Sequence, residues 1–368
     1  MSATIIQKAL RRSLAQIRHV CPVRPGAAEG LVAEVYAQVE QDFGMLAPPV
    51  ALHSPAAGPL AACWVMLRET LVAQGLADRA AKETVAAAVS LGNACPYCVA
   101  VHNAVLGGLA SGREATVIAS DRIGSIADPA LRDLAAWARL SGQRDATVRG
   151  AAPFAAEQLP ELAGVAVTFQ YLNRMVTVFL AESPLPAGLP AGMAGGLMRV
   201  LGRILRPAAL SAPEPGASLA LLPEAPIPGD LGWAAGRPFI ADAFARAIAA
   251  IEAAGVHAAP ESVRELVLGE LAGWSGQPRG PSRSWADEAV CRLGFADRPA
   301  GRLALLTAFA PYQIGPADID EFRRGQGTDE ALVELTSWAS LAAARRVGAW
   351  LGKMPSGPAY RAPAAEPP

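Results

Sequence analysis

The chain has 368 residues, of which 52% are hydrophobic and 18% charged, and its formal net charge is −1. This balance argues against broad electrostatic attraction to nucleic acid. No continuous apolar stretch reaches the roughly 20 residues that a membrane-spanning helix needs. Alanine dominates and β-branched residues do not gather into alternating runs, so we expect an all-α fold. The length favours two domains.

Residues 1–20 lack the apolar core and the small-residue cleavage site of a signal peptide. The five cysteines are an odd number without the spacing of a disulfide framework, which fits a reducing compartment. We therefore expect a cytoplasmic protein, with neither nucleic acid nor membrane among its partners.

Apolar residues at helical spacing predict a series of helices along the first half. A short basic helix over residues 5–18 is typical of a surface or partner-docking element rather than of a membrane contact. Further helices are expected over Gly30–Phe43, Leu60–Val72, Thr84–Leu91, Asp128–Leu140 and Leu162–Leu180, with a proline-broken loop at residues 45–55. Within these segments, Cys63 is expected to be a small buried hydrophobic residue and His53 a loop residue.

After the Thr84–Leu91 helix the chain breaks at Gly92-Asn93 and reads Cys95-Pro-Tyr-Cys98, with His102 four residues further on. Proline favours the first position of a helix, which places Cys95 at or beside the N-cap, where the helix end favours a thiolate. Cys98 and His102 are four residues apart and share a helix face. The short break makes the preceding helix run back antiparallel, so the Glu83 carboxylate is positioned to meet the imidazole.

This pattern, Glu-x11-Cys-x2-Cys-x3-His, resembles the active-site signature of the AhpD-like branch of the carboxymuconolactone decarboxylase superfamily. The resemblance implies a thiol-dependent peroxidase of the alkylhydroperoxidase type that uses no cofactor and no metal. Cys98 would attack a small-molecule peroxide, Cys95 would resolve the product as a disulfide, and His102 with Glu83 would deprotonate Cys98. Regeneration would need a dithiol reductant that the sequence does not name. Tyr97 stands where family members can carry a second histidine, so the chain of groups that passes the proton is expected to be shorter here.

Three other interpretations of the motif stay open at this point. Structural zinc would need four ligands, and the motif supplies three. The remaining histidines, His19, His53 and His257, lie outside it. A cofactor-free decarboxylase of the same superfamily would have no need of a redox dithiol, and a non-enzymatic redox sensor or adaptor would use the disulfide to change an interface. Two ordinary buried cysteines would not explain why Glu83 and His102 stand in register with them.

The second half resembles a degraded copy of the first. Lys82–Val85 aligns with Arg264–Val267 at an offset of 182, and Leu134–Ala138 aligns with Leu306–Ala310 at an offset of 172. Carried forward, the first offset puts Gln277, Gly280 and Ser284 in place of the two cysteines and the histidine. The copy would therefore be a scaffold without redox chemistry.

These patterns divide the chain into four parts. Residues 1–185 form the AhpD-like redox module, and residues 186–230, dense in Pro and Gly, form a linker with one short helix at Leu197–Leu205. Residues 231–352 form the degenerate second module, and residues 353–368 form a disordered tail. Because modules of this superfamily assemble, a homo-oligomer is expected.

Overall fold

The computed structural model describes residues 12–109, 112–185, 191–355 and 357–360. These residues form helices joined by turns and loops, with no strand among them, which confirms the all-α expectation. In chain order the α-helices are α2 (Gly30–Asp42), α3 (Pro48–Ala51), α4 (Ala57–Leu67), α5 (Arg79–Gly92), α6 (Pro96–Leu109), α7 (Gly112–Ala119), α8 (Pro129–Leu140), α9 (Arg144–Arg149), α10 (Leu159–Phe179), α11 (Ala191–Leu210), α12 (Pro238–Ala258), α13 (Glu261–Gly273), α14 (Ser284–Val290), α15 (Arg298–Phe309), α16 (Pro316–Gln326) and α17 (Asp329–Leu351). None of the described helices is long and apolar enough to cross a membrane.

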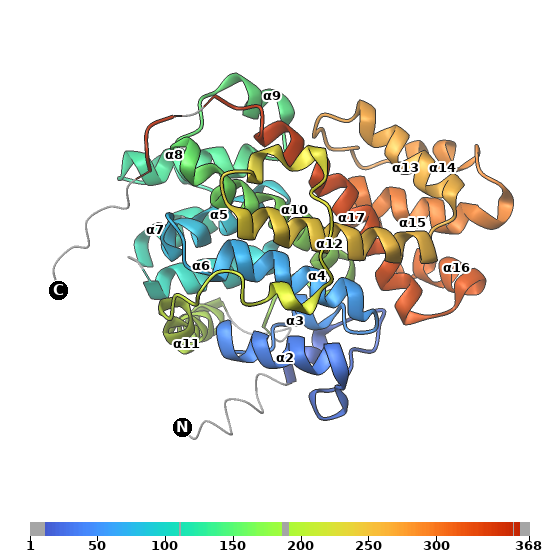
Figure 1. The fold of residues 1–368 in the computed structure, drawn as a ribbon, viewed down its shortest axis with the longest axis horizontal. Coiled ribbons are helices and arrows are strands. Elements are labelled where there is room, and N and C mark those ends of the chain that lie inside the picture. Colours follow the sequence, from blue (N-terminus) through green and yellow to red (C-terminus); the bar gives the residue numbers. More distant parts are fainter. Residues whose placement is uncertain (1–11, 110–111, 186–190, 356, 361–368) are drawn as a thin grey trace.

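The helices α10 and α17 pack against each other at the centre of the molecule (Figure 1). Both are apolar around most of their circumference, which is typical of a helix enclosed by others. The Ser340 hydroxyl of α17 donates a hydrogen bond of 2.8 Å to the Tyr171 carbonyl of α10, and the Tyr171 hydroxyl lies 3.2 Å from the Ser337 hydroxyl, so the polar groups at this contact have partners. In the same way α4 packs against α12. The two halves of the chain therefore share one continuous hydrophobic core.

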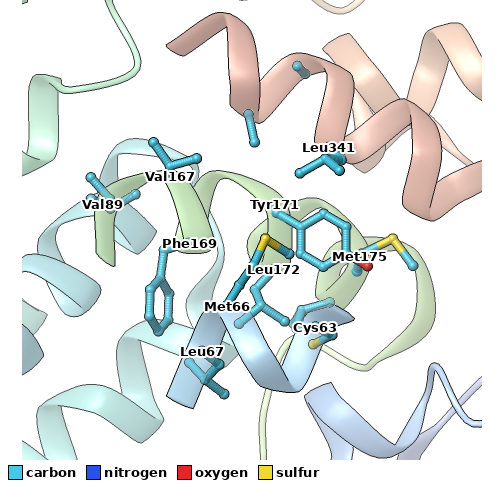
Figure 2. Close-up of a cluster of buried hydrophobic side chains, with 14 of the residues drawn as sticks. Cys63, Met66, Leu67, Val89, Val167, Phe169, Tyr171, Leu172, Met175 and Leu341 are labelled. Carbon is cyan, nitrogen blue, oxygen red and sulfur yellow. The ribbon is translucent and has the colours of Figure 1, made fainter. Parts of the chain in front are cut away.

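Figure 2 shows part of this core, where α10 meets both halves. Phe169 and Leu172 of α10 lie beside Leu67 of α4, and Tyr171 points toward Leu341 of α17. Cys63 of α4 is fully buried here, as the sequence predicts, and burial raises the pKa of its thiol. It is therefore a packing residue rather than a third reactive thiol.

His53 lies in the turn between α3 and α4, as the sequence predicts, and it is buried in the core. Its ring Nδ1 donates to the Val50 carbonyl at 3.2 Å, and its Nε2 accepts from the Tyr171 hydroxyl at 2.8 Å. Burial lowers the pKa of His53 to about 4, although the carbonyl contacts act in the opposite direction. The ring is neutral and serves as a structural link between the segment after α3 and α10.

A buried ion network joins the first half to the segment that follows α11. The Arg68 guanidinium, in the π-helical turn Arg68–Val72 after α4, binds the carboxylates of Asp42 and Glu69 at 2.7 Å each. Glu69 also accepts hydrogen bonds from the Gly216 N–H at 2.6 Å and the Ser218 hydroxyl at 2.7 Å. These bonds attach part of the Pro/Gly-rich segment 186–230 to the core.

The structure differs from the sequence-based elements at four places. Residues 5–11 of the expected basic helix lie outside the described residues, and Arg12–Gln16 form a 3₁₀ helix. The loop at residues 45–55 contains the short helix α3. The helix expected at Leu197–Leu205 is the 20-residue α11. Part of the expected disordered tail is packed, since the Tyr360 N–H donates to the Gln158 side chain at 2.8 Å. The division of the chain into two modules stays a prediction.

Candidate active site

The turn between α5 and α6 carries the cysteine motif. Asp78 caps the start of α5 by accepting a 2.7 Å hydrogen bond from the Ala81 N–H. The helix ends at Gly92, where a Cβ would lie 2.1 Å from the Arg139 carbonyl oxygen of α8, so only glycine fits. Ala94 then adopts a φ of 51°, in the left-handed region that residues with a side chain seldom occupy. This strained turn reverses the chain immediately before the first cysteine, as the sequence predicts.

Cys95 occupies the N-cap position of α6. Its N–H donates to the Ser90 carbonyl at 2.9 Å, and its carbonyl accepts the first intrahelical bond from the Val99 N–H at 3.1 Å. Pro96 is the first residue of the helix, where its missing N–H removes no bond. The Cys98 N–H of the first turn interacts with the Cys95 sulfur.

The two motif thiols are free, buried and adjacent, with exposed fractions of 2% for Cys95 and 3% for Cys98. Interaction with the Cys98 side chain lowers the pKa of Cys95 against the effect of burial, and the Cys98 N–H, Thr177 and Asn173 lower it further. The same interaction and burial raise the pKa of Cys98. Of the two thiols, Cys95 is therefore the one that loses its proton more readily.

Glu83 and His102 meet as the spacing predicts. The His102 Nδ1 lies 2.7 Å from Oε2 of Glu83, and the other carboxylate oxygen accepts a 2.8 Å bond from the Arg79 guanidinium. Burial alone would raise the pKa of Glu83, but Arg79 and His102 outweigh it and hold the pKa below its usual value. The ionised carboxylate thus keeps the proton on Nδ1 and leaves Nε2 as the exchangeable nitrogen. The edge of Phe169 packs against the imidazole, with ring centroids 4.6 Å apart.

A polar cluster from α10, which the sequence analysis did not assign to the site, surrounds the cysteine turn. Asn173 donates to the Ser90 hydroxyl at 3.0 Å and accepts from the Asn93 amide at 2.9 Å. Together with Thr177 it also interacts with the Cys95 thiol. In the sequence, the only indication that these residues belong to the site is that they are polar within an otherwise apolar helix.

A cavity of about 350 Å³ opens on Cys98. Its floor contains Tyr97, Cys98 and His102 of α6 with Phe169 and Leu172 of α10. The remaining wall is almost entirely apolar and comes from α11 and the segment around α3. Cys98 and His102 both line this cavity. Within the described part of the chain, no hydrogen bond joins the His102 ring to either cysteine sulfur.

The helix α11 forms one wall of this cavity through Leu197, Leu201, Ile204 and Leu205. It lies directly on α6, because a Cβ at Gly202 would approach the Ala104 carbonyl oxygen to 2.1 Å. The Arg206 guanidinium also donates to the Gly108 carbonyl at 2.8 Å. A segment interpreted from its composition as a linker thus contributes directly to the candidate site.

Metal-ligand geometry does not arise around these residues. Within the described ranges, no group of three or more His, Cys, Asp or Glu side chains lies close enough together to hold a metal ion. The imidazole of His257 lies elsewhere, paired with Glu334 at 2.6 Å in the second half.

Comparison with known proteins gives a match along nearly the whole chain. A protein of Mycobacterium tuberculosis named alkyl hydroperoxide reductase is 37% identical over 346 residues, which cover 94% of this chain and 98% of the relative. The chain belongs to the AhpD-like alkyl hydroperoxide reductase family. The family resemblance drawn from the motif is therefore confirmed. No family model matches the chain, and no solved structure matches it.

The match to this alkyl hydroperoxide reductase includes both halves of the chain, because 94% of this chain is covered. The second half is thus shared with another member of the family. It is not an extension peculiar to this sequence.

Proposed function

We propose that the chain is a thiol-dependent peroxidase that reduces organic hydroperoxides through a Cys95–Cys98 dithiol/disulfide cycle. The observation that carries this proposal is the meeting of Cys98 and the Glu83-bound imidazole of His102 on one apolar cavity. The relative named alkyl hydroperoxide reductase supports the same class of reaction.

In the first step the Cys98 sulfur attacks one oxygen of the hydroperoxide. An S–O bond forms, the O–O bond breaks, and Cys98 becomes a sulfenic acid. The thiol proton passes through His102 to the departing alkoxide, which leaves as an alcohol. The ionised Glu83 stabilises the imidazolium that forms during this transfer.

In the second step Cys95 resolves the sulfenic acid. Its lowered thiol pKa makes it a ready nucleophile toward the adjacent Cys98 sulfur. The S–S bond forms as the S–O bond breaks, and hydroxide departs and is protonated to water. This division of roles agrees with the geometry, since Cys98 lines the cavity whereas Cys95 lies at the helix end behind it.

The second half is proposed to be a degenerate copy of the first that acts as scaffold. Its helices α12, α13, α15 and α17 follow one another in the order of α4, α5, α8 and α10, and the pairs α4–α12 and α10–α17 pack together. Such packing covers apolar faces that would otherwise be exposed over large areas.

The apolar wall predicts a preference for bulky hydroperoxides. With dithiothreitol as reductant, we expect kcat/KM for cumene hydroperoxide to exceed that for hydrogen peroxide by about tenfold or more, because burial of apolar surface contributes roughly 25 cal/mol per Å². Leu201→Ser on the cavity wall should reduce this ratio, whereas Leu210→Ser, at the exposed end of α11, should leave it unchanged. Consumption of either peroxide no faster than by dithiothreitol alone would refute the proposed function.

A further inference from the structure

A second cavity, of about 270 Å³, also borders the cysteine turn, through residues that do not line the first. Asn93 and Ala94 of the turn form part of its wall, as do Asn173 and Thr177, the two α10 residues that interact with the Cys95 thiol. Residues of the second half complete it, among them Trp274, Gln277 and Phe309. Phe169 and Leu172 of α10 line the cavity that contains Cys98, whereas Asn173 and Thr177, which interact with the Cys95 thiol, line the other.

The lining of this second cavity differs in chemistry from that of the first. Its lining includes several side-chain amides and two arginines among three aromatic residues. One guanidinium, that of Arg139, is neutralised by Asp121 through two contacts of 2.7 Å. The cavity is thus suited to a polar, negatively charged molecule, whereas the first is suited to an apolar one.

The other guanidinium, that of Arg174, is 92% buried and has no carboxylate partner among the described residues. Its Nε donates to the Ala308 carbonyl at 2.9 Å, and its Nη1 binds the backbone and side-chain oxygens of Gln170. The Trp274 ring lies 5.8 Å from the guanidinium carbon. Burial, without any compensating negative charge, lowers the pKa of Arg174 to about 10. A buried cation is costly unless it is paired, so this arrangement lacks an anion.

We propose that the second cavity is the binding site of the electron donor, and that this donor is a small thiol bearing a carboxylate. The carboxylate would pair with Arg174, and the thiol would point toward the Cys95 sulfur past Asn173 and Thr177. The proposal rests on the dithiol cycle described above and adds the chemical class of the reductant and its route, with two molecules of a monothiol in place of the dithiol that the family resemblance implies. A charged thiol would be poorly accommodated by the apolar cavity on the Cys98 side.

The reduction balances with two equivalents of the donor. A donor thiolate attacks the Cys95 sulfur of the disulfide, forming a mixed disulfide and releasing Cys98 as a thiolate that His102 can protonate. A second donor thiolate then attacks the donor sulfur of the mixed disulfide and releases the Cys95 thiolate. The two donors leave as their own disulfide, two electrons having passed to the protein.

The test uses the full-length protein with its disulfide formed by diamide, so that it does not depend on peroxide. Rates of disulfide reduction are measured with 3-mercaptopropionate, which is anionic, and 2-mercaptoethanol, which is neutral. The rate of each thiol with the protein is divided by the rate of the same thiol with a small-molecule disulfide, which gives a normalised rate. The charge preference is the normalised rate of the anionic thiol divided by the normalised rate of the neutral thiol. We expect a preference of about tenfold or more in the unmodified chain, the scale of a charge-assisted hydrogen bond.

Two variants remove this preference by different routes. Arg174→Met deletes the cation, while Gln277→Glu adds a negative charge at an exposed position of the cavity wall and leaves the core unaltered. Both should lower the charge preference about tenfold. The matched control Gln41→Glu adds the same charge on the exposed face of α2, away from the cavity, and should not change it. Propionate, which has no thiol, should slow reduction by the anionic thiol in the unmodified chain and should have much less effect in Arg174→Met, which lacks the cation that would bind it.

The proposal is overturned by equal normalised rates for the two thiols in the unmodified chain. A preference that survives both cavity variants, or inhibition by propionate that is the same in Arg174→Met as in the unmodified chain, overturns it too. Failure of diamide to produce the Cys95–Cys98 disulfide would remove the dithiol cycle itself, and this proposal with it. Normal reaction with peroxide combined with no charge preference would refute the donor site alone.

Discussion

Replacing Cys98 with serine is expected to reduce peroxide turnover to the rate of the free dithiol, a loss of roughly 10³-fold or more. A serine hydroxyl is not ionised near neutral pH and cannot displace an oxygen of the peroxide as a thiolate does. Turnover of cumene hydroperoxide with dithiothreitol measures the loss. Cys291→Ser is the matched control, because that cysteine is exposed in the second half and does not line the cavity.

The roles of the two cysteines are separated by trapping the sulfenic acid. In Cys95→Ser, peroxide should oxidise Cys98 once, and dimedone should label it because no resolving thiol is present. In Cys98→Ser, no label should appear at Cys95, although its thiol has the lower pKa, because Cys95 does not line the cavity. Labelling of Cys95 in Cys98→Ser would reverse the assignment and make Cys95, the thiol with the lower pKa, the peroxide-reactive residue.

Replacing Glu83 with glutamine is expected to slow peroxide reduction by roughly 10²–10⁴, the scale of a positioned acid–base group. Glutamine has nearly the same shape, but it removes the negative charge between Arg79 and His102. The imidazole then loses the negative charge that stabilises the imidazolium formed during proton transfer, and the amide, which can donate as well as accept, no longer fixes one tautomer. The measurement is kcat for cumene hydroperoxide in variants whose circular dichroism matches that of the unmodified chain.

The second half offers a matched control for this substitution. Glu334 pairs with His257 at 2.6 Å, nearly the distance of the Glu83–His102 pair, but the His257 side chain is 68% exposed and remote from the cysteines. Glu334→Gln should therefore leave kcat unchanged. Equal kcat values for Glu83→Gln and the unmodified chain would mean that the thiols react without the relay.

The central part of the site could be predicted because its information is local. The spacing of Cys95, Cys98 and His102 along one helix, with Pro96 at its start, determines their relative placement. Glu83 follows from the short turn between two antiparallel helices. The all-α fold follows from composition and helical periodicity for the same reason, since both are properties of neighbouring residues.

What could not be predicted depends on contacts between distant residues. Proline and glycine in segment 186–230 indicated a linker, yet its glycines allow α11 to lie against α6, with Gly202 at the Ala104 carbonyl. Polar residues of α10 such as Asn173 become part of the thiol environment only once α10 packs beside the cysteine turn. Likewise, the second cavity forms where Arg174 meets Trp274 of the other half. No local pattern contains these pairings.

The most direct test of the dithiol cycle adds one equivalent of cumene hydroperoxide to the fully reduced protein. Free thiols are then counted and the cysteine-containing peptides identified by mass spectrometry. The account predicts the loss of two thiols per chain, a Cys95–Cys98 linkage and full recovery of both thiols after dithiothreitol, with Cys21, Cys63 and Cys291 still reduced. Both motif thiols remaining free, or a disulfide that involves any other cysteine, would contradict it.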